Sequence, residues 1–252
     1  MICYKGVALG VPVAGLGVMH ADCLDVLPLL SGVRTIFADP PDNIGLAYNG
    51  YDDKMSPACY YGWLERVVLA ALARCEVFWL SYYWKHDLEI KYFVRQILKY
   101  RHPAFDSRTF LWRYTFGQHR EKDCGSGFRF LLRLSRVPMD VVRVESERQR
   151  LGDARANPLG RVPDDAWDDA VWSVPRVVGN SAERCRWHPT QHPIGLLDRV
   201  LRMSGGPVVD LFAGTGSMLK AAGGLGIEAL GIEIDRYYVE RVIECGFVEV
   251  LV

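Results

Sequence analysis

The chain of 252 residues is 50% hydrophobic and 24% charged, which allows one sizeable core or a core with a modest appended module. Its 30 basic and 30 acidic residues give a formal net charge of zero, which by itself gives no sign of a polyanionic partner. Seven cysteines, odd in number and without a CxxC pair, argue against a disulfide framework and a zinc knuckle, so we expect no metal.

The N-terminal segment is apolar but is not expected to enter a membrane. The stretch GVALGVPVAGLGVM is interrupted by glycine and proline, lacks a basic n-region and leads into a polar segment. We therefore expect no signal peptide and no membrane partner, and we place the protein in the cytoplasm. Next, GVMHADCLDVLPLL predicts a strand that ends at Asp22 and then a helix. RTIFADPP predicts a strand over Thr35–Ala38 with Asp39 at its carboxyl end.

The middle of the chain is basic. Residues 101–161 contain 13 Lys and Arg against 7 Asp and Glu, a surplus of +6. This surplus fits a solvated basic face and a nucleic-acid groove about equally, because aromatic residues are interleaved with the charges: Phe110, Trp112, Tyr114, Phe116, Phe128 and Phe130. WRYTFGQHREKDCGSGFRF predicts a half-buried strand pair around CGSG, and ESERQRLGDARANPLGRVPDD predicts a long Arg-rich loop.

The C-terminal part predicts a complete strand, loop, helix and strand unit. A strand over Pro207–Leu211 leads into a glycine-rich turn, a helix through Met218–Ala222 and a second strand over Glu228–Ile232. One more helix, Tyr237–Glu244, and a short terminal strand follow. This is too little to complete a doubly wound sheet, so the missing strands must come from the N-terminus.

The turn of this unit predicts a nucleoside-cofactor site. Gly214 and Gly216 let the backbone approach a ligand, and Glu233 after the second strand can accept both hydroxyls of a ribose. NAD and ATP are disfavoured, because Leu219 replaces the third glycine of the dinucleotide fingerprint and the GK[ST] ending is absent. Since open sheets bind ligands beyond the carboxyl ends of their strands, we expect Asp22, Asp39, Glu233 and the Gly214 turn to converge on one crevice.

Asp210–Ser217, DLFAGTGS, resembles the Phe-x-Gly-x-Gly loop of S-adenosylmethionine (SAM)-dependent methyltransferases. With the Asp-Pro-Pro triad first and this loop last, the chain resembles the permuted β-class DNA amino-methyltransferases. Nearly the whole length is covered, by the blocks HADCLDVLPLL, IFADPP, RQRLGDARANPLGRVPDDAW, VPRVVGNSAERCRWHPTQHPIGLLDRVL and VVDLFAGTG. The resemblance implies an α/β, Rossmann-like methyltransferase fold, circularly permuted, with an inserted target-recognition region. It implies a catalytic half at 1–100, target recognition at 101–190 and a SAM-binding half at 191–252.

The resemblance also implies the site residues. The catalytic set is Asp39, Pro40, Pro41 and Asp42, and the cofactor set is Asp22, Cys23, Asp39, Thr190, Gln191, Asp210, Phe212, Gly214, Gly216, Ser217 and Glu233. An exocyclic amine is a poor nucleophile because its lone pair is delocalised into the ring. If Asp39 accepts one amino hydrogen and the Pro40 carbonyl the other, the positive charge that develops on nitrogen is stabilised. Without this context, an Asp-Pro turn and a histidine pair (His188, His192) that binds zinc are the alternatives.

Asp42 departs from the family pattern, in which an aromatic residue at this position stacks on the flipped base. We favour the explanation that another ring takes over, with Tyr48, Tyr51 and Trp84 as candidates. The alternatives are that Asp42 bonds to the base, or that the protein binds SAM and DNA but methylates poorly.

The recognition region supplies the candidate DNA contacts. Arg148, Arg155 and Arg161 are expected at phosphates, and Gln149 and Asn157 at an adenine edge. DDAWDDAVW nearly repeats itself, so the roles of Trp167 and Trp172 cannot be separated.

The predicted function is site-specific methylation of adenine N6 in DNA after base flipping, since Asp before the prolines favours adenine in the resembling family. Cytosine N4 is the alternative target. A protein or RNA amine methyltransferase would not explain the long Arg-rich middle segment. DNA is the expected partner, and a homodimer and a companion restriction enzyme are compatible with the resemblance.

Overall fold

The computed structural model describes residues 9–10, 15–118, 122, 124–140, 142–162 and 173–251. Its centre is an eight-stranded sheet in the order β10-β2-β9-β8-β4-β5-β7-β6. The strands are β2 (Leu16–His20), β4 (Thr35–Ala38), β5 (Val77–Tyr82), β6 (Asp106–Gln118), β7 (Ser126–Ser135), β8 (Val208–Asp210), β9 (Ala229–Glu233) and β10 (Val248–Glu249). Six of them are parallel, and β7 and β6 are antiparallel at one edge. A separate parallel pair joins β1 (Leu9–Gly10) to β3 (Leu30–Ser31).

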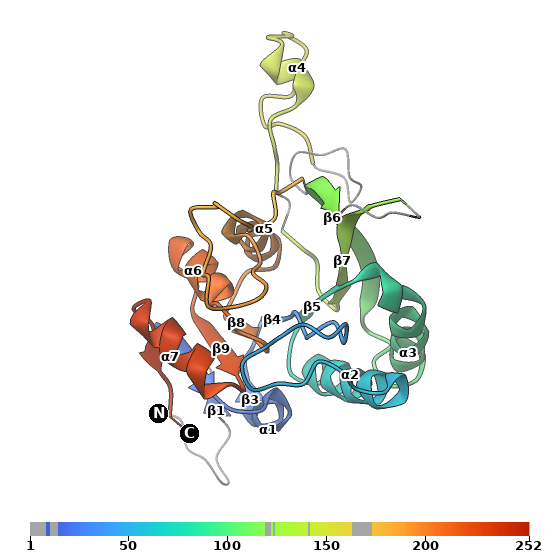
Figure 1. The fold of residues 1–252 in the computed structure, drawn as a ribbon. Helices are drawn as coiled ribbons and strands as arrows, with labels where there is room; N and C mark the ends of the chain where they lie inside the picture. The colour runs from blue at the N-terminus through green and yellow to red at the C-terminus, as the bar shows by residue number, and fades with distance from the viewer. Residues whose placement is uncertain are drawn as a thin grey trace.

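Helices cover both faces of the sheet (Figure 1). One buried cluster packs α1 (Cys23–Val26), α2 (Pro57–Leu72) and α3 (Asp87–Tyr100) on one face. The other packs α5 (Ile194–Ser204), α6 (Ser217–Gly224) and α7 (Arg236–Glu244) on the opposite face. Two short 3₁₀ turns, η1 (Leu27–Leu29) and η2 (Trp84–His86), complete the helical elements around the sheet. No helix in the described ranges is long and apolar enough to cross a membrane.

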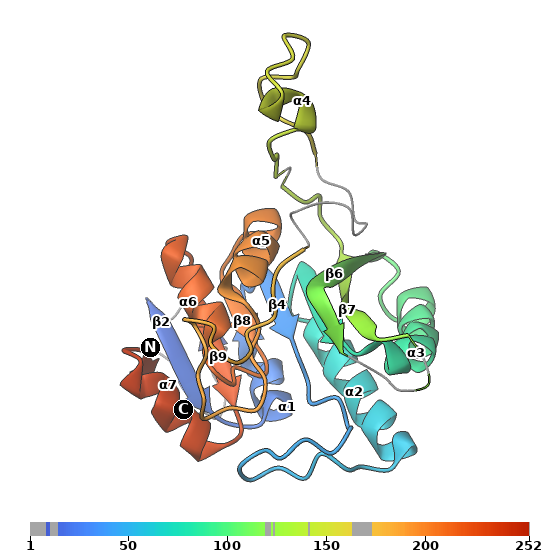
Figure 2. The ribbon, with the colours of Figure 1, turned by 45° about the horizontal axis from the view of Figure 1, so that its top comes forward.

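The strand order shows the permutation expected from the sequence. β8 and β9, from the C-terminal part, lie between β2 and β4 from the N-terminal part, so that red and orange strands lie between two blue strands in Figure 2. All four residues of β4 are buried because a parallel sheet is covered on both faces. The predicted strand over Thr35–Ala38 is confirmed, and the predicted elements of the C-terminal unit are observed with ends shifted by one or two residues.

The predicted strand pair around CGSG is confirmed as β6 and β7, but the pair is not a separate module. β7 pairs with β5, so the hairpin extends the central sheet beyond the catalytic strands. A division of function at residue 101 therefore does not coincide with a break in the sheet, and the assignment of 101–190 to target recognition stays a prediction. Trp167 and Trp172 lie outside the described residues.

An arm formed by residues 144–161 stands away from this body, with α4 (Glu147–Arg150) near its tip (Figures 1 and 2). Its base is closed by a bridge between Val144 and Arg161. The Ser146 hydroxyl accepts from the backbone N–H of Gln149, whose side chain accepts from the N–H of Ser146, so a capping box begins α4.

Candidate active site

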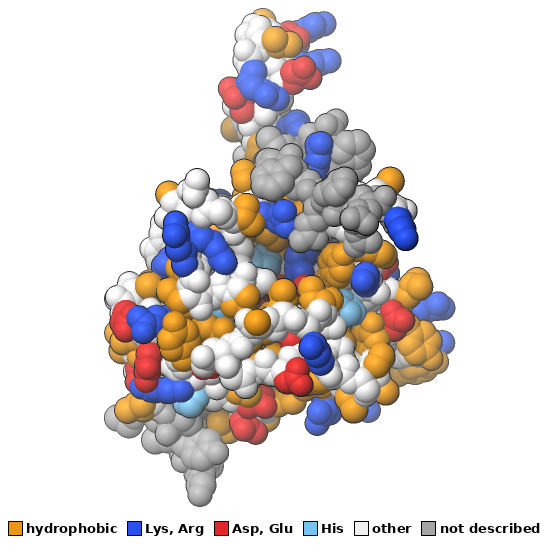
Figure 3. All heavy atoms as spheres, viewed as in Figure 1, with side chains coloured by type: hydrophobic (Ala, Val, Ile, Leu, Met, Phe, Trp, Pro, Cys, Tyr) orange, Lys and Arg blue, Asp and Glu red, His pale blue; other side chains and the backbone are white. Residues whose placement is uncertain are grey.

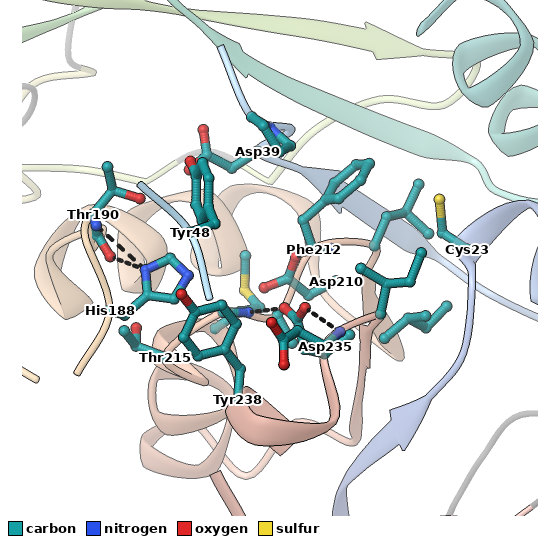
Figure 4. A pocket seen from close by; sticks show the side chains of 18 of the residues that line it. Cys23, Asp39, Tyr48, His188, Thr190, Asp210, Phe212, Thr215, Asp235 and Tyr238 are labelled. Carbon is teal, nitrogen blue, oxygen red and sulfur yellow. Dashed lines mark hydrogen bonds between the residues drawn. The ribbon is translucent and has the colours of Figure 1, made fainter. Parts of the chain in front are cut away.

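A cavity lies at the carboxyl ends of the central strands, between the two halves of the permuted sheet (Figure 4). Most of the predicted site residues line it: Asp22, Cys23, Asp39, Pro41, Thr190, Gln191, Asp210, Phe212, Gly214, Ser217 and Glu233. Pro40, Asp42 and Gly216 do not line it. Residues from both ends of the chain therefore meet in one crevice, as the strand order requires.

Two buried carboxyl groups, Asp210 and Glu233, line this cavity. Asp210 ends β8 and is buried, and burial, helped by the carboxylates of Asp39 and Glu233, raises its pKa to about 7. Burial also raises the pKa of Glu233, although this carboxylate accepts from the backbone N–H of Gly214 (2.8 Å) and of Asp235 (2.9 Å). Among the described residues neither acid forms an ion pair with a cation, so the cavity is suited to a positively charged ligand.

The glycine-rich turn before α6 needs its glycines for two different reasons. Gly214 has a φ of +48°, and a Cβ there would lie 3.2 Å from Nε2 of His188. Gly216 has a φ of +70°, but its Cβ would face Val242 rather than the cavity. Gly216 therefore shapes the turn and its packing on α7 without lining the cavity.

His188, from the WHPTQHP block, packs against the turn. Its Nδ1 donates to the Thr190 carbonyl (2.6 Å), and its ring contacts Tyr238 and Tyr48 at centroid distances of 4.5 and 5.7 Å. Burial lowers the pKa of His188, so the ring is held neutral. Among the described residues, no group of three or more His, Cys, Asp or Glu side chains is arranged to hold a metal ion.

A loop of residues 43–55, here called the crevice loop, crosses from the catalytic half to the opposite half (Figure 2). The buried carboxylate of Asp53 accepts four of its backbone N–H groups at 2.7–3.1 Å. Across the crevice, the Asn49 amide donates to both oxygens of Asp235 at 3.1 and 3.0 Å. This loop brings Tyr48 and Tyr51 into the cavity wall, and Figure 4 shows the Tyr48 ring beside Asp39.

Asp39 sits in a closed network of four side chains. Its Oδ1 accepts from Nη2 of Arg129 (2.7 Å), and its Oδ2 lies 3.0 Å from Nδ1 of His192. Ser81 closes the ring, because its hydroxyl accepts from Nε of Arg129 (2.7 Å) and lies 3.0 Å from Nε2 of His192. Burial alone would raise the pKa of Asp39, but His192 and Arg129 outweigh it and hold the pKa below its usual range. The carboxylate is therefore ionised at neutral pH.

Asp42 turns toward Arg129 rather than into the cavity. Its two oxygens accept from Nη1 (2.6 Å) and Nη2 (3.0 Å) of Arg129, and Oδ1 also accepts from the backbone N–H of Tyr83 (3.3 Å). Among the rings expected to replace an aromatic residue here, Tyr48 and Tyr51 line the cavity, whereas Trp84 donates to the Ser126 hydroxyl (3.0 Å).

No sequence motif singled out Arg129 or Ser81, and the sequence suggested only a zinc ligand for His192. The Arg and aromatic alternation of β7 did mark Arg129 as a strand residue. The residues next to Arg129 in the sequence did not distinguish it from an arginine that contacts DNA, because its partner Asp42 lies 87 positions away.

The predicted DNA-binding residues lie on the arm, where Figure 3 shows basic and acidic side chains together. Arg148 is exposed, and Arg155 forms an ion pair with Asp153 (3.0 Å). The Gln149 amide donates to the Pro158 carbonyl (3.2 Å), and the Asn157 side chain accepts from the N–H of Leu159 (3.0 Å). Both amides thus bond within the arm, and their contact with a base stays a prediction. Arg161 lies at the base of the arm, opposite Val144.

The arrangement of strands, glycine-rich turn and Asp-Pro-Pro triad is that of a methyltransferase. The sequence profile of the family N6_N4_Mtase, described as DNA methylase, matches residues 33–244, and the chain belongs to this family. Membership confirms the resemblance, the fold class and the SAM cofactor that the sequence predicted.

Two relatives show how far this similarity extends. The chain is 29% identical over 238 residues to DNA adenine methyltransferase YhdJ of Escherichia coli (strain K12), covering 88% of this chain and 80% of that protein. It is 28% identical over 247 residues to type II methyltransferase M.ScaI of Streptomyces caespitosus, covering 88% and 78%.

Solved structures share the fold. The complex of M1.HpyAVI with SAM has a TM-score of 0.58 at 17% identity, over 90% of this chain and 97% of that chain. The cytosine-N4-specific PvuII DNA methyltransferase has a TM-score of 0.62 at 14% identity, over 91% and 86%.

Proposed function

We propose that this DNA methyltransferase transfers the methyl group of SAM to the N6 amine of adenine in DNA, with Asp39 as the acceptor for an amino hydrogen. The observation that carries the proposal is the ionised Asp39 carboxylate at the wall of the cavity, beside the Tyr48 ring. A carboxylate has about four acceptor positions, so Arg129 and His192 leave room for an amino hydrogen. The Pro40 carbonyl stays the predicted second acceptor, although Pro40 itself does not line the cavity.

The residues around the cavity suit SAM. We assign Glu233 to the ribose hydroxyls, the backbone around Gly214 to the methionine part and Phe212 to the adenine ring, because all three residues line the cavity. The buried acids Asp210 and Glu233 favour a cation in the cavity, which the sulfonium and ammonium groups of SAM provide. When bound, SAM supplies an activated methyl group on its sulfonium.

Asp39 acts as a hydrogen-bond acceptor in this proposal. Because its pKa lies below its usual range, it stays ionised as the amine becomes tetrahedral, and it stabilises the positive charge that develops on nitrogen. A base stacked in duplex DNA cannot reach the cavity and must be flipped out. We assign the stacking face for that base to Tyr48, which lines the cavity next to Asp39.

Recognition of DNA is assigned to residues 101–190, with the arm as its projecting part. Its arginines, Arg148, Arg155 and Arg161, would contact phosphates, and the base-reading roles of Gln149 and Asn157 require their present bonds to open. A homodimer and a companion restriction enzyme remain predictions.

Adenine is favoured over cytosine by the Asp that precedes the prolines and by the similarity to the adenine methyltransferase YhdJ. The test is mass spectrometry of nucleosides from DNA treated with the purified protein and SAM. N6-methyladenine is the expected product. N4-methylcytosine would overturn the choice of base, and unmodified DNA would favour a SAM- and DNA-binding protein with little activity.

A further inference from the structure

We propose that Arg129 and Asp42 form a positioning pair for Asp39. In this pair, Asp42 anchors the guanidinium group, and the guanidinium fixes one oxygen of Asp39 toward the cavity. The inference rests on the proposed role of Asp39 as the amine acceptor. It gives the replacement of the usual aromatic residue at position 42 a physical reason.

The geometry of Arg129 divides its bonds unequally between two carboxylates. Asp42 receives two of them, from Nη1 (2.6 Å) and Nη2 (3.0 Å), whereas Asp39 receives one, from Nη2 (2.7 Å). Arg129 belongs to β7 and is only 9% exposed as a residue, so these bonds are shielded from water. A two-point contact with a carboxylate fixes the plane of a guanidinium. Asp42 thus sets where Arg129 can meet Asp39.

The other contacts of the network can all be hydrogen bonds at once, with one donor and one acceptor in each. Nε of Arg129 donates to the Ser81 hydroxyl, and that hydroxyl can donate to Nε2 of His192. Nδ1 of His192 then donates its hydrogen to Oδ2 of Asp39 (3.0 Å). Each oxygen of Asp39 is thereby held by a different element of the fold.

An aromatic residue at position 42 would leave Arg129 with Asp39 as its nearest anion. The guanidinium would then be drawn into a two-point contact with Asp39, because that is the favoured geometry of such pairs. This contact would occupy acceptor positions that the amine needs. Asp42 prevents it by holding the guanidinium to a single bond with Asp39.

The pair also affects the pH at which Asp39 becomes protonated. The charged or titratable groups near Asp39 come from several elements: Arg129 on β7, His192 before α5, Asp42 and Tyr48 after β4, Asp210 on β8 and Tyr114 on β6. Arg129 lowers the pKa of Asp39, so its removal raises that pKa. Because transfer requires the ionised carboxylate, the acidic limb of the pH–rate profile then moves to higher pH.

The experiment is a double-mutant cycle with Asp42→Asn, Arg129→Gln and the combined variant, measured by single-turnover methyl transfer to DNA across pH. We expect each single change to slow transfer by about tenfold or more, with SAM affinity altered by less than about threefold. We expect the combined loss to be smaller than the product of the two single losses, since both changes break the same contact. The acidic limb should move to higher pH in both variants that lack Arg129.

Arg133→Gln is the matched control, because Arg133 lies on the same strand, is also 9% exposed and packs on Phe110. It should leave the rate and the acidic limb unchanged. If Arg129→Gln does not fold, the combined variant, which leaves no unpaired charge at either position, carries the same pH test.

The proposal is wrong if the wild type methylates DNA and the cycle variants match Arg133→Gln in rate and pH profile. Additive losses would also contradict it. If the wild type transfers no methyl group, the proposed function fails instead. Carbon-detected NMR titration of Asp39 in wild type and the combined variant then tests the pair without any measurement of activity. A higher pKa of Asp39 in the variant supports the pair, and an unchanged pKa contradicts it.

Discussion

Replacing Asp210 by asparagine should stabilise the cofactor-free protein while weakening its hold on SAM. Asp210 is 5% exposed at the end of β8, and its Oδ1 accepts from the backbone N–H of Phe212 (3.1 Å). Asparagine has the same shape and can keep this bond. It removes only the charge, so any change in stability reports the cost of burying the carboxylate.

The size of that cost follows from the pKa. Burial, with a smaller contribution from Asp39 and Glu233, raises the pKa of Asp210 from 3.8 to about 7. At 1.36 kcal/mol for each factor of ten in acidity, an ionised Asp210 costs the folded state roughly 4 kcal/mol. Because the folded-state pKa is the higher one, the cost grows as pH rises from about 4 to about 7 and is constant above.

Urea unfolding of wild type and Asp210→Asn at pH 8 and pH 5 measures this cost. We expect the variant to be more stable at pH 8 by about 2–4 kcal/mol, and by less than about half of that gain at pH 5. Calorimetry should show weaker SAM binding by the variant, because the cation loses an anionic partner. Asp52→Asn, which changes an exposed carboxyl on the crevice loop, is the control. Equal stability of wild type and Asp210→Asn at both pH values would refute the reasoning.

Three further changes test other parts of the site. Asp42→Tyr should lower the thermal midpoint and should not raise methyl transfer, because breaking the buried pair with Arg129 costs ~3–5 kcal/mol and stacking by the new ring returns only ~1–3 kcal/mol. A tenfold gain in single-turnover transfer would contradict this. Gly214→Val should weaken SAM binding by about tenfold or more, because its φ of +48° and the adjacent imidazole exclude a branched side chain; unchanged calorimetric titration would count against it. Arg148→Gln with Arg155→Gln should weaken DNA binding and reduce the slope of its salt dependence by up to ~1 for each phosphate that is no longer bound, and an unchanged slope would remove the arm from the interface.

The parts of the fold with a local signature could be predicted. Thr35 and the three apolar residues Ile36–Ala38, followed by Asp39, define a buried parallel strand with a polar residue at its carboxyl end. Likewise, the two glycines between β8 and α6 define a turn that only positive φ values allow. The meeting of N-terminal and C-terminal strands in one sheet could also be predicted, because neither end of the chain has enough strands to complete a sheet alone.

The acceptor network could not be predicted, because it depends on pairing between distant segments. Arg129 reaches Asp39 through the antiparallel register of β7 on β5, in which Tyr82 pairs with Phe130. An alternation of arginine and aromatic residues is equally typical of a DNA-binding strand, so composition did not indicate a catalytic neighbour. The hydrogen bonds of Gln149 within the arm could not be predicted for a different reason. A glutamine amide can complete a capping box as well as it can bind an adenine edge.

The most direct test of the account is single-turnover incorporation of tritiated methyl from SAM into DNA by wild type and Asp39→Asn. The asparagine keeps the shape of Asp39, but it removes the anion and presents an amino group to the substrate. We predict that transfer falls by at least about a hundredfold, since losing one such interaction in the transition state costs ~3 kcal/mol, while SAM affinity stays within about tenfold. Transfer by Asp39→Asn within tenfold of wild type would contradict the assignment of Asp39 as the amine acceptor.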